Sequence, residues 1–290
     1  MRIIPGEVKT AELHAHLLGS VSPRPICFAS TIDSEGAPNL SPFSFFNAFG
    51  SKPPILIFSP ARRVRDNTIK HTLENVYANK EVVINMVSYD MVQQMNLSSC
   101  EYPKGVNEFE KAGFTPIPSD FVQPFRVKES PVSIECKVLQ VIETGQEGGA
   151  ANLIICEVLC MHINDQVLDA NGRIDPHRID LVARMGGDYY CRASGSAVFE
   201  VAKPNTSLGI GIDALPEDIR HSKVLSGNHL GLLGNVTAIP VLGPIGPDAR
   251  LEQILSDFSE HTARTEALHQ YARDLMDAGD IDKAWQVLLA

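Results

Sequence analysis

Residues 25–58 constrain the fold more than any other stretch of this chain. Two β-favouring runs flank the turn sequence Asp-Ser-Glu-Gly at residues 33–36, which is the pattern of a β-hairpin. The second run is unusual, because residues 41–44 read Ser-Pro-Phe-Ser where an ordinary strand would carry Val or Ile. Proline has no N–H group for a sheet ladder, so we expect a sheet edge, a bulge or a strand end here. Hydroxyl groups and free backbone amides beside aromatic rings suit a flat ligand with a polar edge.

The sequence that follows the hairpin predicts further antiparallel strands with short helices between them. We expect helices at residues 89–97 and 107–112, and strands at residues 54–59, 81–87, 131–144 and 152–164. Strands joined by hairpins favour a mainly β fold, a barrel rather than a parallel sheet. No Gly-x-Gly-x-x-Gly or Gly-Lys-[Ser/Thr] sequence is present, so any nucleotide would bind without a Rossmann crevice.

A basic turn lies between two of these predicted strands. Three arginines fall within residues 62–65, and the spacing of apolar residues over 66–77 predicts a helix with Asp66 or Asn67 as its N-cap. Free N–H groups at a helix start and nearby cationic side chains together favour an anion. A solvated basic loop is the alternative. The chain has a net charge of -10, so this local concentration of positive charge favours a phosphate site.

The charge and hydropathy of the whole chain exclude several classes of protein. A net charge of -10 argues against nucleic acid as the main partner, because phosphate neutralisation needs a basic surface. No apolar run approaches the roughly 20 residues that cross a bilayer, and the first residues lack the apolar stretch of a secretory signal. We therefore expect a cytoplasmic protein with no membrane partner.

The cysteines and histidines predict no metal site. The chain has 6 cysteines and no Cys-x-x-Cys pair, so we expect reduced, mostly buried thiols. Cys156 and Cys160 should lie on one face of their strand as core thiols. His14 and His16 have no third ligand at a suitable spacing, and we interpret them as ordinary histidines.

The character of the chain changes beyond about residue 200. We predict a domain boundary at residue 204, followed over 205–290 by a loop-rich segment and then helices from residue 249 onward. The sequence Ala-Gly-Asp at 278–280 separates the last two helices into a helical hairpin. A single such hairpin cannot bury its own apolar face, so it must dock on something. We interpret residues 205–290 as a docking or dimer-stabilising extension.

Several motifs together resemble the flavin reductase-like family. They are Ser-Pro-Arg-Pro at 22–25, Ser-Thr-Ile-Asp at 30–33, Asn-Leu-Ser-Pro-Phe-Ser-Phe-Phe-Asn at 39–47, Lys-His-Thr-x-x-Asn at 70–75, Glu-Val-Val-Ile-Asn at 81–85 and Arg-Met-Gly-Gly-Asp-Tyr-Tyr at 184–190. The resemblance covers about residues 10–200 and implies an FMN-binding split β-barrel with short inserted helices. The α-helical C-terminal extension exceeds the usual family length.

The resemblance also implies a homodimer that binds one FMN per subunit. It places Ser30 and Thr31 along the flavin or its ribityl chain. Typical members carry Asp where this chain has His71, a change that keeps the phosphate site at least as cationic. At the polar edge of the ring the resemblance places Ser41, Pro42, Phe43 and Ser44, and it also includes Asn39 at the start of the 39–47 motif. At the phosphate it places Ser59, Arg62, Lys70 and Thr72.

The activity that the resemblance implies is an NAD(P)H-dependent flavin reductase, an oxidoreductase. Hydride would pass from nicotinamide C4 to flavin N5, and reduced FMN would go to a monooxygenase or another electron acceptor. His177 is a candidate to assist nicotinamide binding or proton exchange. A flavoredoxin-like electron carrier reduced by a protein partner would use the same FMN contacts. A non-enzymatic barrel with a partner-binding helical extension is a third interpretation.

Overall fold

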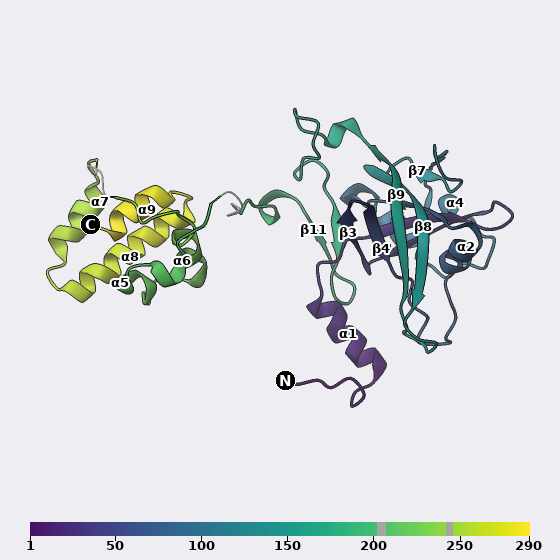
Figure 1. The fold of residues 1–290 in the computed structure, drawn as a ribbon, viewed down its shortest axis with the longest axis horizontal. Helices are drawn as coiled ribbons and strands as arrows, with labels where there is room; N and C mark the ends of the chain where they lie inside the picture. The colour runs from purple at the N-terminus through teal and green to yellow at the C-terminus, as the bar shows by residue number, and fades with distance from the viewer. Residues whose placement is uncertain (202–206, 242–245) are drawn as a thin grey trace. The chain divides into compact units, whose positions relative to one another are not determined.

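The computed structural model describes residues 1–201, 207–241 and 246–290. The chain divides into two compact units, Met1–Phe199 (unit 1) and Glu200–Ala290 (unit 2), drawn in Figure 1. The predicted domain boundary at residue 204 falls outside the described residues. Each unit has its own hydrophobic core.

Unit 1 is built on a seven-stranded antiparallel sheet with the order β2-β1-β5-β8-β9-β4-β3. The strands are β1 (Cys27–Ile32), β2 (Pro38–Phe43), β3 (Phe46–Ser51), β4 (Pro54–Phe58), β5 (Glu81–Asn85), β8 (Val132–Glu143) and β9 (Asn152–Ile163). Two small hairpins accompany it, formed by β6 (Pro116–Ile117) with β7 (Arg126–Val127) and by β10 (Val182–Arg184) with β11 (Tyr190–Arg192). Antiparallel strands dominate unit 1, so the predicted mainly β architecture is confirmed, and the sheet is open, with β2 and β3 at its edges.

Short helices precede, separate and follow these strands. They are α1 (Thr10–Ser20), α2 (His71–Asn79), α3 (Val92–Leu97) and α4 (Glu108–Ala112), with 3₁₀ turns η1 (Tyr89–Met91), η2 (Asp165–Val167) and η3 (Gly195–Ala197). The helix predicted at 89–97 is present as η1 followed by α3, and the helix predicted at 107–112 is present as α4. The Asn107 side chain caps α4 by accepting a hydrogen bond from the backbone amide of Phe109. None of the helices in the described ranges combines the length and apolarity that a membrane crossing requires.

Strand β1 explains why the opening hairpin lies at the centre of unit 1. Its six residues are all buried, because β2 and β5 flank it and both of its faces are covered. Side chains alternate along a strand, so Cys27 and Ala29 enter one core cluster while Phe28 enters another. The partner strand β2 is an edge strand, as its proline predicts, and Pro42 lies opposite Phe28.

The helix predicted over residues 66–77 begins later than expected. The structure starts α2 at His71 with Lys70 as the N-cap residue, so Asp66 and Asn67 are not caps. The Asp66 carboxylate instead accepts hydrogen bonds from the backbone amide and hydroxyl of Thr68, and Asn67 adopts a left-handed φ of 58°. This local turn competes with helix formation at the same residues. A second difference is α1, which lies within a segment that we expected to be only a lead-in.

The long β8–β9 hairpin contains two bulges, which change the predicted faces of its side chains. The register passes from Cys136 opposite Val158 to Glu135 opposite Cys160, so Leu159 has no partner. An unpaired residue shifts all later residues to the opposite face. Cys156 is buried as predicted, but Cys160 is only partly buried and lies outside the core clusters. The prediction of one shared core face for both thiols is therefore wrong.

Unit 2 is a small helical domain. Its elements are η4 (Ile212–Ala214), α5 (Glu217–Arg220), α6 (Gly227–Leu233), α7 (Ala249–Asp257), α8 (His261–Asp277) and α9 (Ile281–Leu288). The predicted helical hairpin is present as α8 and α9. It docks within its own unit, because Trp285, Ala284 and Ala272 are buried in one cluster with Leu233 of α6 and Leu251 of α7.

Candidate functional site

A buried network of polar side chains joins β1, β2 and α2. The side-chain amide of Asn39 donates to the hydroxyl oxygens of Thr31 (3.2 Å) and Thr72 (3.0 Å). The amide of Asn75 donates to the same Thr31 oxygen at 3.1 Å. Three of the predicted FMN-binding residues, Thr31, Asn39 and Thr72, therefore lie together, and all are at most 8% exposed. Their hydrogen bonds attach the start of α2 to the edge of the sheet.

Ser59 and Arg62 line a cavity just beyond the end of β4. The Ser59 hydroxyl accepts the Asn152 amide at 3.2 Å, and the Ser59 amide donates to the Phe45 carbonyl at 2.9 Å. The Arg62 guanidinium donates to the Asn67 side chain at 2.7 Å and to the Asn67 carbonyl at 2.9 Å. Both residues face a cavity of about 550 Å³, hereafter the β4 cavity. The β4 cavity has apolar walls from α1, from the residues just before β3 and just after β4, and from β9, which include Leu13, Leu17, Phe45, Ala61 and Leu153.

Lys70 concentrates positive charge beside the start of α2. Burial lowers the pKa of Lys70, and repulsion from Arg63 and Arg65 lowers it further, against attraction from Glu101. Glu101 is already engaged, since it accepts from Arg63 at 3.0 Å and from Arg65 at 2.6 Å. Within the described ranges the Lys70 ammonium has no ion-pair partner of its own. A bound anion would therefore stabilise its charged form against burial and the repulsion from Arg63 and Arg65.

His71 and Ser30 lie in different surroundings from Lys70. His71 lines a small cavity of about 20 Å³ with Asn39, Asn75 and Lys104. Ser30 on β1 is fully buried, and its hydroxyl has no hydrogen-bond partner in the described part of the chain. His71 therefore borders the polar network, and neither residue lines the β4 cavity.

The Ser-Pro-Phe-Ser segment at residues 41–44 borders a different cavity. Pro42, Phe43 and Ser44 line a cavity of about 180 Å³ together with Arg184 and Tyr190. Ser44 accepts a hydrogen bond from the Arg24 guanidinium at 3.3 Å, and Phe43 packs against Phe58 with ring centroids 5.6 Å apart. Ser41 is half-buried opposite Ala29. Of the predicted ring-binding residues, Pro42, Phe43 and Ser44 thus line one cavity. The predicted phosphate-binding residues Ser59 and Arg62 line another, the β4 cavity.

The comparisons with known proteins agree with this architecture. The family description "Flavin reductase like domain" matches residues 18–178. An uncharacterized protein of Aquifex aeolicus is 39% identical over 201 residues, which are 69% of this chain and 100% of that protein. Nitrilotriacetate monooxygenase component B from Bacillus cereus superimposes with a TM-score of 0.64 at 28% identity, covering 69% of this chain and 98% of that one. A Shewanella frigidimarina protein with a split barrel domain gives a TM-score of 0.57 at 27% identity, covering 68% and 96%.

The chain belongs to the flavin reductase like family. Its sheet-rich unit has the split-barrel fold of these relatives, and the open sheet with edges β2 and β3 agrees with that description. The family match ends at residue 178, so unit 2 lies outside it.

The residues around the β4 cavity fit a flavin of this family. FMN combines a flat tricyclic ring, apolar on its faces and polar along one edge, with a phosphate dianion, so it suits an apolar wall beside positive charge. Phe45 and Leu153 supply the wall, while Ser59 and Arg62 supply a hydroxyl and a cation at the same cavity. The half-buried, unpaired Lys70 adds a cation at the N-terminus of α2, where the first backbone N–H groups of a helix favour anions.

Several residues around the flavin reductase motifs were missed by sequence reasoning. The Arg24 guanidinium donates to the carbonyls of Leu18 (2.6 Å) and Met185 (2.9 Å), which ties the first motif to the last. Phe45 belongs to the 39–47 motif, but its position in the β4 cavity depends on α1, which the sequence did not predict. Arg192 stacks on Tyr89 with 3.9 Å between the guanidinium carbon and the ring centroid, a contact with no local sequence signal.

His177 lies in the exposed turn Asp-Pro-His-Arg at 175–178. Its backbone amide donates to the Asp175 carboxylate at 2.8 Å, which attaches it to its own turn. Among the described residues, no side-chain hydrogen bond links His177 to the predicted flavin residues. Its role in catalysis stays a prediction from the sequence.

Proposed function

We propose that unit 1 binds FMN and acts as an NAD(P)H-dependent flavin reductase. The observation that carries the proposal is the β4 cavity, in which an apolar wall meets the hydroxyl of Ser59 and the guanidinium of Arg62. Family membership supports the same ligand class. When bound, the flavin would supply the hydride-accepting chemistry, and the protein would supply binding, orientation and electrostatics.

In this proposal the residues around the β4 cavity have separate roles. Ser59 and Arg62 hold the phosphate, and Lys70 adds long-range positive charge from the start of α2. Phe45 faces the ring. The hydrogen bonds of Asn39 hold the start of α2 against β2. The apolar side chains of α1 exclude water from the ring, which strengthens the electrostatic interactions inside the cavity.

A separate cavity suits the nicotinamide nucleotide. It has a volume of about 400 Å³, and it shares Arg184 and Tyr190 with the cavity of Pro42 and Ser44. Arg184 stacks on Tyr190 at 4.6 Å and Arg192 stacks on Tyr89 at 3.9 Å, so two guanidinium groups are held in place by aromatic rings. Stacked arginines can pair with phosphate oxygens through their remaining N–H groups. In Arg192 these exclude the two nitrogens that donate to Asp180 at 2.7 Å. We assign this cavity to NAD(P)H.

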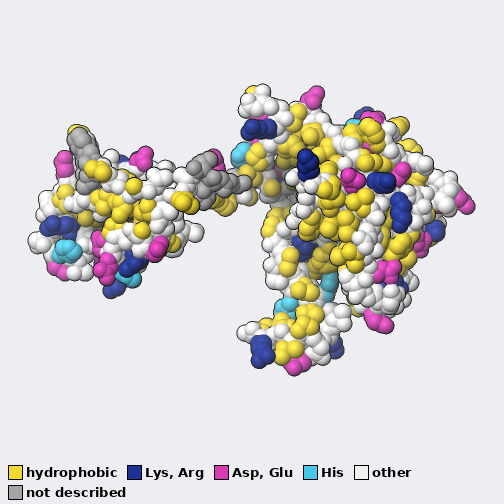
Figure 2. All heavy atoms as spheres, viewed as in Figure 1, with side chains coloured by type: hydrophobic (Ala, Val, Ile, Leu, Met, Phe, Trp, Pro, Cys, Tyr) yellow, Lys and Arg dark blue, Asp and Glu magenta, His cyan; other side chains and the backbone are white. Residues whose placement is uncertain are grey.

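We further propose a homodimer that passes reduced flavin to a separate acceptor. The Bacillus cereus relative is named as component B of a monooxygenase, which supports a two-component arrangement. Apolar side chains are exposed on β3, β8 and β9, including Phe49, Leu139, Leu159 and Met161. Figure 2 shows hydrophobic side chains gathered over the face of unit 1 that carries β4 and β9. Sedimentation velocity of the full chain tests the dimer, and a concentration-independent monomer contradicts it.

Stopped-flow reduction tests the proposed activity. The FMN-loaded protein is mixed anaerobically with NADH or NADPH, and flavin absorbance is followed over time. We expect rapid bleaching by at least one nucleotide. Protein that fails to bind FMN overturns the site. Protein that binds FMN but is bleached by neither nucleotide overturns the reductase assignment and favours an electron carrier reduced by a protein partner.

A further inference from the structure

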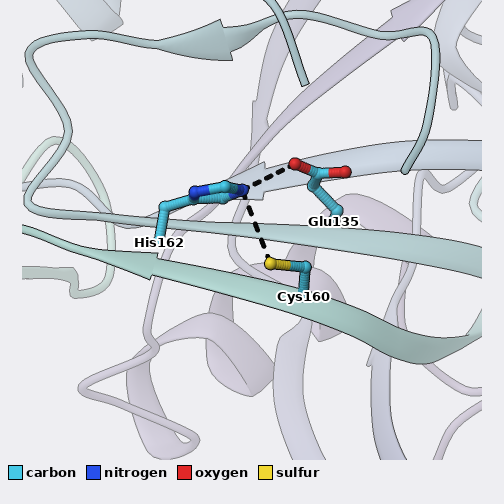
Figure 3. Close-up of side chains that lie close together, drawn as sticks. All are labelled: Glu135, Cys160 and His162. Atoms are coloured by element: carbon cyan, nitrogen blue, oxygen red, sulfur yellow. Dashed lines mark hydrogen bonds and ion pairs between the residues drawn. The ribbon is translucent and has the colours of Figure 1, made fainter. Parts of the chain in front are cut away.

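Three potential metal ligands converge on the β8–β9 hairpin of unit 1. Figure 3 shows the side chains of Glu135, Cys160 and His162 pointing toward one another. The Nε2 atom of His162 lies 2.6 Å from Oε1 of Glu135 and 3.6 Å from Sγ of Cys160. One oxygen, one nitrogen and one sulfur all fall within 4.8 Å of one another.

The bulge at Leu159 creates this convergence. Without it, Cys160 would share the core face of Cys156, but the shifted register places Cys160 directly opposite Glu135. His162 follows two residues later on the same strand, so its side chain points to the same face as Cys160. Three ligand types thus meet on one face of the sheet at the β8–β9 pairing.

The carboxylate is held in place by backbone amides. The side chain of Glu135 has no exposed surface. Its Oε1 accepts the Asp120 amide at 2.9 Å and its Oε2 accepts the Phe121 amide at 2.6 Å. Such outer hydrogen bonds orient metal-ligating carboxylates in known sites. The other two ligands are reachable from solvent, since His162 has a side-chain exposure of 22% and Cys160 is half-buried.

The ligand set selects the kind of ion. Thiolate, imidazole and carboxylate together are the ligands of zinc-class divalent ions, whereas magnesium and calcium prefer oxygen alone. We propose that Glu135, Cys160 and His162 form a binding site for one Zn²⁺ ion, with Asp120 or water as the fourth ligand. An Asp120 carboxylate oxygen lies 3.9 Å from His162 Nε2. Tetrahedral zinc separates nitrogen and oxygen ligands by about 3.3 Å, so the partly exposed imidazole must move outward by roughly 0.7 Å.

A simpler arrangement competes with the zinc site. Glu135 and His162 can form an ion pair that only anchors the loop of Asp120 and Phe121. The two alternatives differ in Cys160, because the ion pair makes no use of its sulfur. Cys160→Ala therefore removes a zinc ligand and leaves the ion pair and its amide contacts intact.

Calorimetric titration of the reduced, metal-free full chain with Zn²⁺ tests the site. We expect one ion per chain, and Co²⁺ should give a near-ultraviolet thiolate-to-cobalt charge-transfer band. Cys160→Ala should lower the Zn²⁺ affinity by about 10-fold or more and abolish the cobalt band. Cys100→Ala is the matched control, because Cys100 is exposed and lies outside the cluster.

The paired N-terminal histidines need their own control, since His14 and His16 could capture zinc independently. The double variant His14→Ala/His16→Ala should leave the affinity and the cobalt band unchanged. Absence of stoichiometric Zn²⁺ binding overturns the proposal. So does binding that is retained in a Cys160→Ala protein whose circular dichroism matches the parent, or binding that disappears in the double histidine variant.

Discussion

The side-chain amide of Asn39 donates a 3.0 Å hydrogen bond to the hydroxyl oxygen of Thr72. This contact joins the edge strand β2 to the first turn of α2, and both residues are buried. Asn39 also donates to Thr31 on β1, so one amide connects the β1–β2 hairpin to α2, which begins about 30 residues later. The N-terminus of α2, and with it Lys70, is thereby positioned relative to the sheet.

Thr72→Val should destabilise unit 1 through this contact. The substitution keeps the shape of the side chain but leaves a buried N–H of Asn39 without its acceptor, which costs about 1 to 2 kcal/mol of unfolding free energy. Urea denaturation followed by circular dichroism measures the loss. Thr115→Val is the control, because Thr115 is exposed and its hydroxyl makes no hydrogen bond among the described residues. Equal stability of the two variants would contradict the structural role of the network.

Lys70→Met should weaken FMN binding. Lys70 is half-buried and repelled by Arg63, so the phosphate dianion would be its natural partner. We expect the Kd for FMN to rise about 3-fold, because Lys70 does not line the β4 cavity and would act on the phosphate at longer range. Quenching of flavin fluorescence measures the affinity. Lys128→Met, which removes an exposed lysine elsewhere in unit 1, should leave it unchanged. A Lys70→Met protein with the parental Kd would place the phosphate elsewhere.

Periodicity and turn signals predicted most of the sheet correctly. The hairpin of β1 and β2, the edge position of Pro42 and the long hairpin of β8 and β9 all follow from side-chain alternation and turn residues. These features are local, so a single stretch of sequence contains the information that they require.

Features that depend on competing or distant contacts were not predictable. The start of α2 was misplaced because Asp66 forms a turn with Thr68 instead of a cap. Cys160 was assigned to the wrong face of β9 because counting every second residue assumes an unbroken strand. The residues around Leu159 carry no sequence signal for the bulge. The separation of Ser44 and Ser59 into different cavities arises from tertiary packing.

Arg192→Gln should impair the use of the nicotinamide nucleotide while FMN binding stays intact. The guanidinium stacks on Tyr89 and pairs with Asp180 at 2.7 Å in the cavity assigned to NAD(P)H. We expect the KM for the preferred nucleotide to rise several-fold, roughly the effect of losing one exposed phosphate contact. Arg178→Gln is the matched control, since Arg178 is an exposed arginine in an ion pair with Asp175. A change in FMN affinity with an unchanged KM would reverse the assignment of the cavities.

Asp248 should make the stability of unit 2 depend on acid pH. Burial alone would raise the pKa of Asp248, but the Leu251 amide, Lys283 and Tyr271 outweigh burial and lower the pKa to about 2. Its carboxylate accepts the Tyr271 hydroxyl at 2.8 Å and pairs with the Lys283 ammonium at 2.9 Å. Because the folded pKa lies below the ordinary value of 3.8, the carboxylate stabilises the fold above about pH 4. That stabilisation, about 2 kcal/mol, is lost as the pH falls through about 2.

Fluorescence of Trp285 measures this effect directly, because it is the only tryptophan of the chain and is buried in unit 2. Urea unfolding at about pH 5 and about pH 2.5 gives the loss of stability for the parent and for Asp248→Asn. The amide cannot titrate, so the variant should be less stable at the higher pH and should lose less stability on acidification. Asp257→Asn, which removes an exposed carboxylate from the end of α7, should retain the parental pH dependence. An Asp248→Asn protein with the parental pH dependence would show that the contacts of Asp248 with Tyr271 and Lys283 do not stabilise the helical unit.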